Sequence, residues 1–260
     1  MTKRLMIFLF GLAGYVTFLF TIIYGIGFVD NIYFEKTIDS GSNTNSSVSL
    51  VIDLALIALF GFQHSLMARQ GFKKQLTRLV PEPIERSIFV FSVSLCLLLL
   101  FWQWRPIDGY LWILPGNPIY VLLMTLYGIG WLIVILSTFL INHFDFAGLR
   151  QVYLYLIHRE YTPLEFKQGL LYKIVRHPMM LGLLISFWVT PQMSFGHLTF
   201  ATGMTIYILI GLAFEEHDLL RSFGTIYQQY RKQVPMLLPL PRRKRDTAND
   251  NVETASIARK

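Results

Sequence analysis

Long apolar runs constrain the fold of this chain more than any other feature. A helix that spans a membrane needs about 20 mostly apolar residues. Four runs approach or exceed this length and two shorter ones follow, near 5–28, 49–67, 88–104, 119–141, 179–190 and 199–214. Because the last two are marginal alone, we expect them to form a tilted hairpin. The sequence predicts an all-α polytopic membrane bundle of five to six transmembrane helices, followed by a C-terminal cytoplasmic amphipathic helix.

Composition supports a membrane domain rather than a soluble one. Hydrophobic residues make up 53% of the 260 residues and charged residues 15%, whereas soluble domains have about 25% charged residues. The first apolar run is too long for a signal peptide and no small-residue cleavage site follows it, so we interpret it as a retained span. We expect one membrane domain over 1–241 and a basic, polar, disordered tail over 242–260.

The placement of positive charge predicts the topology. The net charge of +7 comes mostly from short loops and the tail, which favours a topology signal over nucleic-acid binding. With six spans, the loops on one side hold Arg69, Lys73, Lys74, Arg78, Arg86, Arg150, Arg159, Lys167, Lys173 and Arg176. The other side holds only Lys36 and Arg105. Six spans with both termini cytoplasmic are therefore favoured, and a bacterial inner membrane is expected, with the basic tail touching lipid.

Four polar clusters fall at the predicted cytoplasmic ends of the apolar runs, where polar groups are costly unless they have a use. They are Gln63-His64-Ser65 with Arg69, Glu85-Arg86, Asn142-His143-Phe144-Asp145 with Arg150, and Arg176-His177-Pro178 with Glu215-Glu216-His217-Asp218. They predict one polar cavity on that side; helix caps and interfacial anchors satisfied by water are the alternative. The histidines lack metal-site spacing and the one cysteine, Cys96, lies in an apolar run, so no metal site is expected. Nucleophile-elbow, P-loop and dinucleotide motifs are absent.

Two ordered motifs lie in the C-terminal third. Residues 169–182 read GLLYKIVRHPMMLG, and residues 215–235 read EEHDLLRSFGTIYQQYRKQVP. This pair resembles the signature of the isoprenylcysteine carboxyl methyltransferase and phospholipid methyltransferase superfamily. Four more segments are similar to its nurim-like branch, and most of all to bacterial methanethiol S-methyltransferases. They are QHSLMAR (63–69), ERS (85–87), WQWRP (102–106) and STFLINHFD (137–145).

The resemblance implies that S-adenosylmethionine is the methyl donor and binds at 160–182 and 211–239. The implied binding residues are Tyr172, Arg176, His177, Pro178, Gly182, Glu215, Glu216, Tyr227 and Tyr230. Proline suits the first turn of a helix, whose free amides can receive a carboxylate. Glu215 is the expected acceptor for ribose hydroxyls or an amino group.

Two departures from the superfamily pattern bear on the methyl acceptor. The motif tyrosine after Arg-His-Pro is Met180 here. The prenylcysteine enzymes carry a substrate-contacting arginine about one turn before the paired glutamates, where this chain reads Gly-Leu-Ala-Phe over 211–214. A carboxylate substrate would lose its partner, whereas a small neutral thiol such as methanethiol needs none.

Methyl transfer to a thiol needs a positioned nucleophile and favours the thiolate, since thiols such as cysteine have a pKa of about 8.5. We expect His64 or His143 to act as the base, with Asp145 or Glu85 as orienting partners. Arg69 is the expected stabiliser of thiolate charge.

Three alternatives stay open from sequence alone. The methyl acceptor is a lipid, an isoprenoid or a larger thiol; the chain is a non-enzymatic nurim-like membrane protein; or it resembles the sterol reductases, which use NADPH. We expect no required protein partner. The intact Arg-His-Pro and Glu-Glu motifs argue against the second, and the short chain and the absence of a nicotinamide motif argue against the third.

Overall fold

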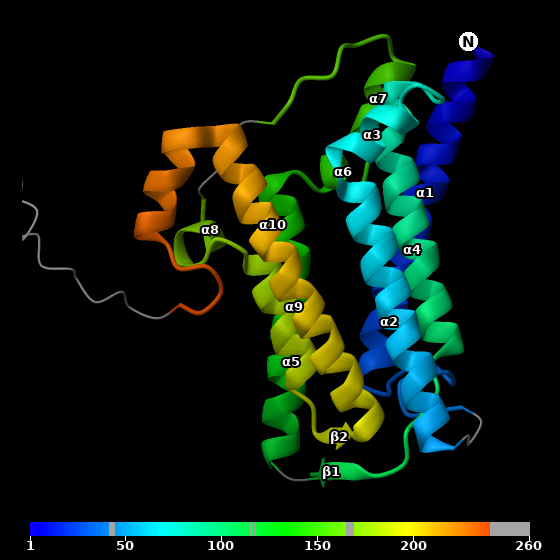
Figure 1. Ribbon diagram of the computed structural model, residues 1–260, viewed down its shortest axis with the longest axis vertical. Coiled ribbons are helices and arrows are strands. Elements are labelled where there is room, and N and C mark those ends of the chain that lie inside the picture. The colour runs from blue at the N-terminus through cyan, green and yellow to red at the C-terminus, as the bar shows by residue number, and fades with distance from the viewer. Residues whose placement is uncertain (42–44, 115, 117, 165–168, 240–260) are drawn as a thin grey trace, which may run out of the picture.

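The computed structural model describes residues 1–41, 45–114, 116, 118–164 and 169–239. The predicted disordered tail, 242–260, lies outside them. The elements are α1 (Thr2–Val29), α2 (Ser46–Ala68), α3 (Gln70–Leu76), the 3-10 turn η1 (Glu82–Ile84), α4 (Glu85–Gln103), β1 (Tyr110–Ile113), α5 (Pro118–Ile141), α6 (His143–Phe146), α7 (Leu149–Leu156), α8 (Leu171–Ile174), α9 (Pro178–Trp188), β2 (Gln192–Ser194) and α10 (Phe195–Gln233). The long helices run alternately up and down through the molecule (Figure 1).

Five helices are long and apolar enough to cross a membrane: α1, α2, η1 with α4, α5 and α10. This confirms the predicted polytopic helical membrane bundle. The fifth predicted span, near 179–190, corresponds to α9, which has only 11 residues. At 1.5 Å per residue α9 is about 17 Å long, shorter than the roughly 30 Å hydrocarbon core. It contacts α10 and lies beside the first half of that helix (Figure 1), and it is too short to be counted among the five long apolar helices.

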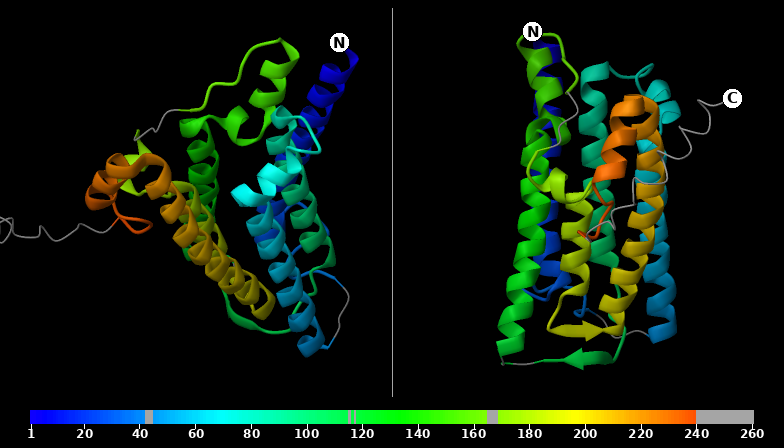
Figure 2. Two further views of the ribbon diagram at one scale, coloured as in Figure 1. Left: turned by 45° about the horizontal axis from the view of Figure 1, so that its top comes forward. Right: turned by 90° about the vertical axis from the view of Figure 1, so that its left-hand side faces the viewer.

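The bundle has two chemically different ends (Figures 1 and 2). We call the end that holds residue 1 the N-terminal end; α3, α6, α7 and the bend of α10 lie there. The four polar clusters identified in the sequence all belong to elements that end or begin at the N-terminal end. The far end holds the β1–β2 pair and the segment that follows α1.

The far end is closed by contacts that sequence analysis did not predict. The antiparallel β1–β2 pair joins Trp112 to Met193, and short strands of this kind form only when a distant partner is available. The Thr190 hydroxyl donates to Asp30 at 2.7 Å, and the Ser194 hydroxyl donates to Asp39. Burial raises the pKa of Asp30 to about 6. These contacts hold α1, α9 and α10 together at one end.

Close packing of two glycines joins α5 to α9. A Cβ on Gly182 would lie 2.6 Å from the carbonyl oxygen of Gly130, and a Cβ on Gly130 would lie 2.9 Å from that of Gly182. No real Cβ fits at such distances, so the two backbones approach as only glycine permits. This contact fixes α9, and with it the Arg-His-Pro turn, against α5.

Candidate methyl-transfer site

A buried carboxylate, Glu216, organises the two C-terminal motifs. Arg176 donates to it twice, from Nε at 2.8 Å and from Nη2 at 3.0 Å. His177 Nε2 lies 2.8 Å from Glu216 Oε1, and the Tyr227 hydroxyl donates to the same oxygen at 2.6 Å. Arg231 Nε lies 3.0 Å from Oε2. We call these five side chains the Glu216 clamp. Four neighbours share one carboxylate, so its acceptor capacity is used within the protein.

The backbone joins the same two motifs. The amide nitrogens of Arg176 and His177 donate to the carbonyls of Pro235 and Met236 at 2.9 and 3.2 Å. Arg176 Nη1 also donates to the carbonyl of Val234 at 2.6 Å. The Val-Pro sequence that ends the second motif therefore lies along the Arg-His-Pro turn. A charged guanidinium buried this deeply is stable because each side of it has an acceptor.

Gly224 makes the clamp possible by folding α10 back on itself. It has φ 53° and ψ −125°, a conformation that costs a residue with a side chain far more than glycine. After this bend the helix returns, which brings Tyr227 to Glu216 and lets the Tyr230 hydroxyl donate to the carbonyl of Tyr172. The predicted amphipathic helix after the spans is therefore the returning half of α10, and it holds α8 in place.

Glu215, the neighbour of the clamp, is in a different state. Its side chain is 49% exposed, against 9% for Glu216, and its Oε2 lies 3.7 Å from His177 Nδ1. The Tyr172 hydroxyl points to the carbonyl of Ser137 on α5 at 3.5 Å. Burial, reinforced by Glu215 and Tyr230, raises the pKa of Tyr172. Glu215 is thus the carboxylate of the pair that has room to accept hydrogen bonds from a ligand.

Pro178 is the first residue of α9, as its sequence predicts, and His177 precedes it as the N-cap. Gly182 lies one turn further on, in the α5–α9 contact described above, where its role is to let two backbones meet. Both residues are buried. The nine implied donor-binding residues therefore divide into four clamp members, a helix start, a packing glycine, one open carboxylate, and the pair Tyr172 and Tyr230, which a hydrogen bond joins.

His143 has both ring nitrogens engaged. The Tyr15 hydroxyl lies 3.0 Å from Nε2, and the Thr138 hydroxyl lies 2.8 Å from Nδ1. Its ring stacks on Phe139 with centroids 4.3 Å apart and an interplanar angle of 5°. Burial lowers the pKa of His143. The imidazole is therefore held on both sides by neighbours from α1 and α5.

Asp145 ties α6 to α7 and to the segment after it. It accepts hydrogen bonds from Arg150 at 2.6 Å, from Gln151 at 3.1 Å and from Tyr161 at 3.2 Å. Among the described residues it contacts neither His64 nor His143. The predicted pairing of Asp145 with a histidine base therefore has no counterpart in these contacts.

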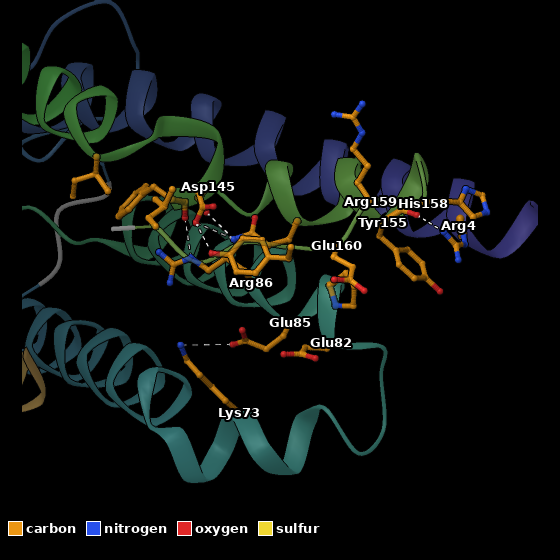
Figure 3. Close-up of a pocket in the computed structure, with 16 residues that line it drawn as sticks. Arg4, Lys73, Glu82, Glu85, Arg86, Asp145, Tyr155, His158, Arg159 and Glu160 are labelled. Atoms are coloured by element: carbon orange, nitrogen blue, oxygen red, sulfur yellow. Dashed lines mark hydrogen bonds and ion pairs between the residues drawn. The ribbon is translucent and has the colours of Figure 1, made fainter. Parts of the chain in front are cut away.

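A cavity of about 960 Å³ opens at the N-terminal end between α4, α6 and α7 (Figure 3). Glu85 and Asp145 line it, and Lys73 Nζ lies 4.0 Å from Glu85 Oε1 across its mouth. Arg86 Nε donates to the carbonyl of Phe146 at 2.9 Å. The remaining charged lining residues are Arg4, Glu82, Arg159 and Glu160. Acidic and basic side chains are equally represented, so the cavity is polar without a strong net charge.

His64 lies elsewhere, among aromatic rings of α2, α4 and α10. Its ring centroid is 5.1 Å from that of Phe89, 5.8 Å from that of Phe60 and 5.8 Å from that of Tyr207. The guanidinium carbon of Arg69, the residue that follows α2, lies 4.2 Å from the centre of the Phe214 ring. His64 and Arg69 thus both face α10, on the approach to Glu215.

Curated relatives cover nearly the whole chain. The methanethiol S-methyltransferase of Crocosphaera subtropica is 48% identical over 237 residues, which is 91% of this chain and 93% of that protein. Methanethiol S-methyltransferase 1 of Bradyrhizobium diazoefficiens is 50% identical over 89% of this chain and 81% of its own length. The methanethiol S-methyltransferase of Mycobacterium tuberculosis is 47% identical over 93% and 99%. The chain belongs to the methanethiol S-methyltransferase family.

More distant similarity connects this methanethiol S-methyltransferase family member to nurim. Bovine nurim is 31% identical over 180 residues, which is 66% of this chain and 68% of nurim. No protein-family profile matches the chain, and no solved structure does. The identities in the 44–50% range, spread over both halves of the chain, support the N-terminal and C-terminal motif interpretations together.

The structure of this family member separates the predicted catalytic residues. His64 and Arg69 face α10, His143 is held between α1 and α5, and Glu85 and Asp145 line the cavity of Figure 3. The described residues contain no cluster of three or more potential metal ligands.

Two residues that contact the predicted site residues were not singled out in the sequence. Arg231, the fourth partner of Glu216, sits inside the second motif and was hidden by its charged surroundings. Tyr207 lies in an apolar run, and only its spacing of eight residues from Glu215 would have pointed to it.

Proposed function

We propose that this protein transfers the methyl group of S-adenosylmethionine to the sulfur of methanethiol, which yields dimethyl sulfide. The observation that carries the proposal is identity near 48% over about 90% of the chain with proteins named for this reaction. The Glu216 clamp, which joins the two C-terminal motifs, and the half-exposed carboxylate of Glu215 also support the proposal.

Glu215 supports S-adenosylmethionine as the donor. Its half-exposed carboxylate is the kind of acceptor that ribose hydroxyls or an ammonium group require. The Glu216 clamp fixes the backbone at Glu215 and the start of α9. The Glu215 carboxylate is therefore held in place before the donor binds. When bound, S-adenosylmethionine supplies a methyl group on a sulfonium; the thiol sulfur forms the new bond to this carbon, and the old bond's electrons return to the donor sulfur.

His64 is the better candidate for the base. Both nitrogens of His143 are engaged with hydroxyl groups, whereas the His64 ring makes no hydrogen bond among the described residues and packs between aromatic rings. His64 would take the thiol proton and pass it to water after transfer. Arg69, held on Phe214 at the same face, would favour the thiolate. Glu85 and Asp145 are assigned to shaping the cavity of Figure 3 rather than to orienting His64.

The acceptor is proposed to be small and neutral. No arginine or lysine occurs in 211–214, so a carboxylate acceptor would lack a cationic partner there. We also propose that the N-terminal end of the bundle is cytoplasmic, where the donor is found. The basic residues of the loops at this end support that orientation.

Purified protein in detergent tests the donor and the acceptor separately. Calorimetry is expected to detect binding of S-adenosylhomocysteine and no binding of NADPH. Headspace gas chromatography is then expected to detect dimethyl sulfide when methanethiol and S-adenosylmethionine are added. A Glu215→Gln variant should fold and lose most of the affinity for S-adenosylhomocysteine. If the protein binds S-adenosylhomocysteine but forms no dimethyl sulfide, the proposed donor is retained and methanethiol is rejected as the acceptor. If it does not bind S-adenosylhomocysteine, the result favours a nurim-like, non-enzymatic protein.

A further inference from the structure

One inward face of α10 lies against α2. A Cβ on Gly203 would lie 2.7 Å from Ile57 of α2, and the Tyr207 ring lies 3.2 Å from the Cβ position of Gly61 on α2. Gly211 and Glu215 follow Gly203 and Tyr207 at intervals of four residues. Residues three or four apart share a helix face. Gly211 and Glu215 therefore lie on the side of α10 that is directed toward α2.

This inward face is closed at one glycine of α10 and open at another. A Cβ on Gly203 would meet Ile57 of α2 at 2.7 Å, whereas a Cβ on Gly211 would meet no described atom within 4 Å. The half-exposed side chain of Glu215 lies one turn beyond Gly211. A position on this face with no neighbour, next to a half-exposed carboxylate, marks an opening.

Tyr207 closes the inner end of this opening. Its ring packs over Gly61 of α2, where a Cβ would lie 3.2 Å from Cδ2, and it contacts the rings of Phe60 and His64 edge-on. Its hydroxyl makes no hydrogen bond to any described residue. Tyr207 and Glu215 are eight residues apart, which separates them by about 12 Å along the helix, with Gly211 midway.

We propose that Tyr207 and His64 receive the thiol at the closed end of the opening. In the same arrangement, Gly211 leaves the space in which the methyl-bearing end of S-adenosylmethionine lies. This inference rests on the methyl transfer proposed above. The Tyr207 hydroxyl donates a hydrogen bond to the sulfur and stabilises the charge left when the proton moves to His64. Because it contacts the acceptor and not the donor, Tyr207 affects catalysis without affecting donor affinity.

The Gly211 part is tested by filling the space. Gly211→Ala and Gly211→Leu form a graded pair, and Gly128→Leu is the matched control, because Gly128 on α5 also has no neighbour within 4 Å of its Cβ position and is exposed. All three variants should keep the melting temperature of the wild type. The dissociation constant of S-adenosylhomocysteine should rise at least tenfold in Gly211→Leu, less in Gly211→Ala and not at all in Gly128→Leu. Wild-type affinity in Gly211→Leu would overturn this assignment.

The Tyr207 part is tested with Tyr207→Phe, which keeps the ring packing and removes the hydroxyl. Affinity for S-adenosylhomocysteine should be unchanged, and kcat with methanethiol should fall about tenfold at pH 7. The deficit should shrink at high pH, where the thiol ionises without help. Tyr110→Phe, at the far end of the bundle, is the control. Equal activity of Tyr207→Phe and wild type across the pH range would refute the hydroxyl's role. If the wild-type protein binds S-adenosylhomocysteine but makes no dimethyl sulfide, methanethiol is not the acceptor. The Gly211 assignment is still tested in that case, because it depends only on the affinity for S-adenosylhomocysteine.

Discussion

Replacement of Glu216 with glutamine tests whether the clamp is the structural centre of the C-terminal half. The substitution preserves shape and one acceptor oxygen but removes the charge shared by Arg176, His177, Tyr227 and Arg231. The substitution also replaces one carboxylate oxygen, an acceptor, with an NH2 group, and this new donor faces the donor groups that surround Glu216. Arg176, whose side chain is 5% exposed, is left as a buried cation without its anion.

The magnitude follows from the burial of this pair. Removing one partner of a buried ion pair costs about 3–5 kcal/mol, because the remaining charge stays out of water. A surface pair would cost at most about 1 kcal/mol. For a chain of this size, 1 kcal/mol corresponds to a few degrees, so the expected loss in melting temperature is on the order of 10 °C.

The assay is thermal unfolding in detergent of wild type, Glu216→Gln and Glu215→Gln, with tryptophan fluorescence as the readout. Glu215 is the matched control, since it is the same residue type one position earlier and is half exposed. Glu216→Gln should lose both stability and affinity for S-adenosylhomocysteine, and Glu215→Gln should lose affinity alone. Equal melting temperatures for Glu216→Gln and wild type would refute the clamp as a source of stability.

Three further outcomes are expected. Gly182→Ala should lower stability by about 1–3 kcal/mol, since the new Cβ would lie 2.6 Å from a backbone oxygen; Gly128→Ala should not, and equal melting curves would contradict the packing argument. The folded-state pKa of Asp30 is raised to about 6, so its protonated form contributes stability that is lost as pH rises toward 6; Asp30→Asn should melt with a weaker dependence on pH between 4 and 7 than wild type. His64→Gln should reduce turnover about 100-fold or more while His143→Gln reduces stability but leaves the pH profile of turnover in place, and the reverse ranking would make His143 the base.

Apolar length was enough to predict α1, α2, α4 and α5, because a spanning helix satisfies its own backbone and needs no distant partner. The predicted span near 179–190 corresponds to α9, which is shorter than a typical spanning helix. Whether that segment crosses depends on where α9 begins, and its start is set by contacts of Arg176 and His177 with Pro235 and Met236. The β1–β2 pair was missed for a related reason, since neither strand exists without the other.

The residues proposed for the site could be named from the sequence, but their surroundings could not. The sequence predicts Glu215 as the acceptor for a ligand, and it gives no sign that Glu216 is the buried carboxylate shared by four groups while Glu215 is half exposed. His143 and His64 are equally plausible bases in sequence. The hydroxyl groups of Tyr15 and Thr138, 128 and 5 residues away, engage His143 and make the difference. Roles of this kind depend on long-range distances that spacing along the chain does not encode.

The closed end of the opening gives a physical reason for a small acceptor. Below Tyr207 the α2–α10 contact is tight, with Tyr207 against Gly61 and Ile57 against Gly203. About 12 Å of helix separates this floor from Glu215, and the donor's reactive end would use the half nearer to Glu215. What remains beside His64 is bounded by the rings of Phe60, Phe89 and Tyr207. Aromatic walls of this kind favour a small apolar acceptor, such as the proposed methanethiol.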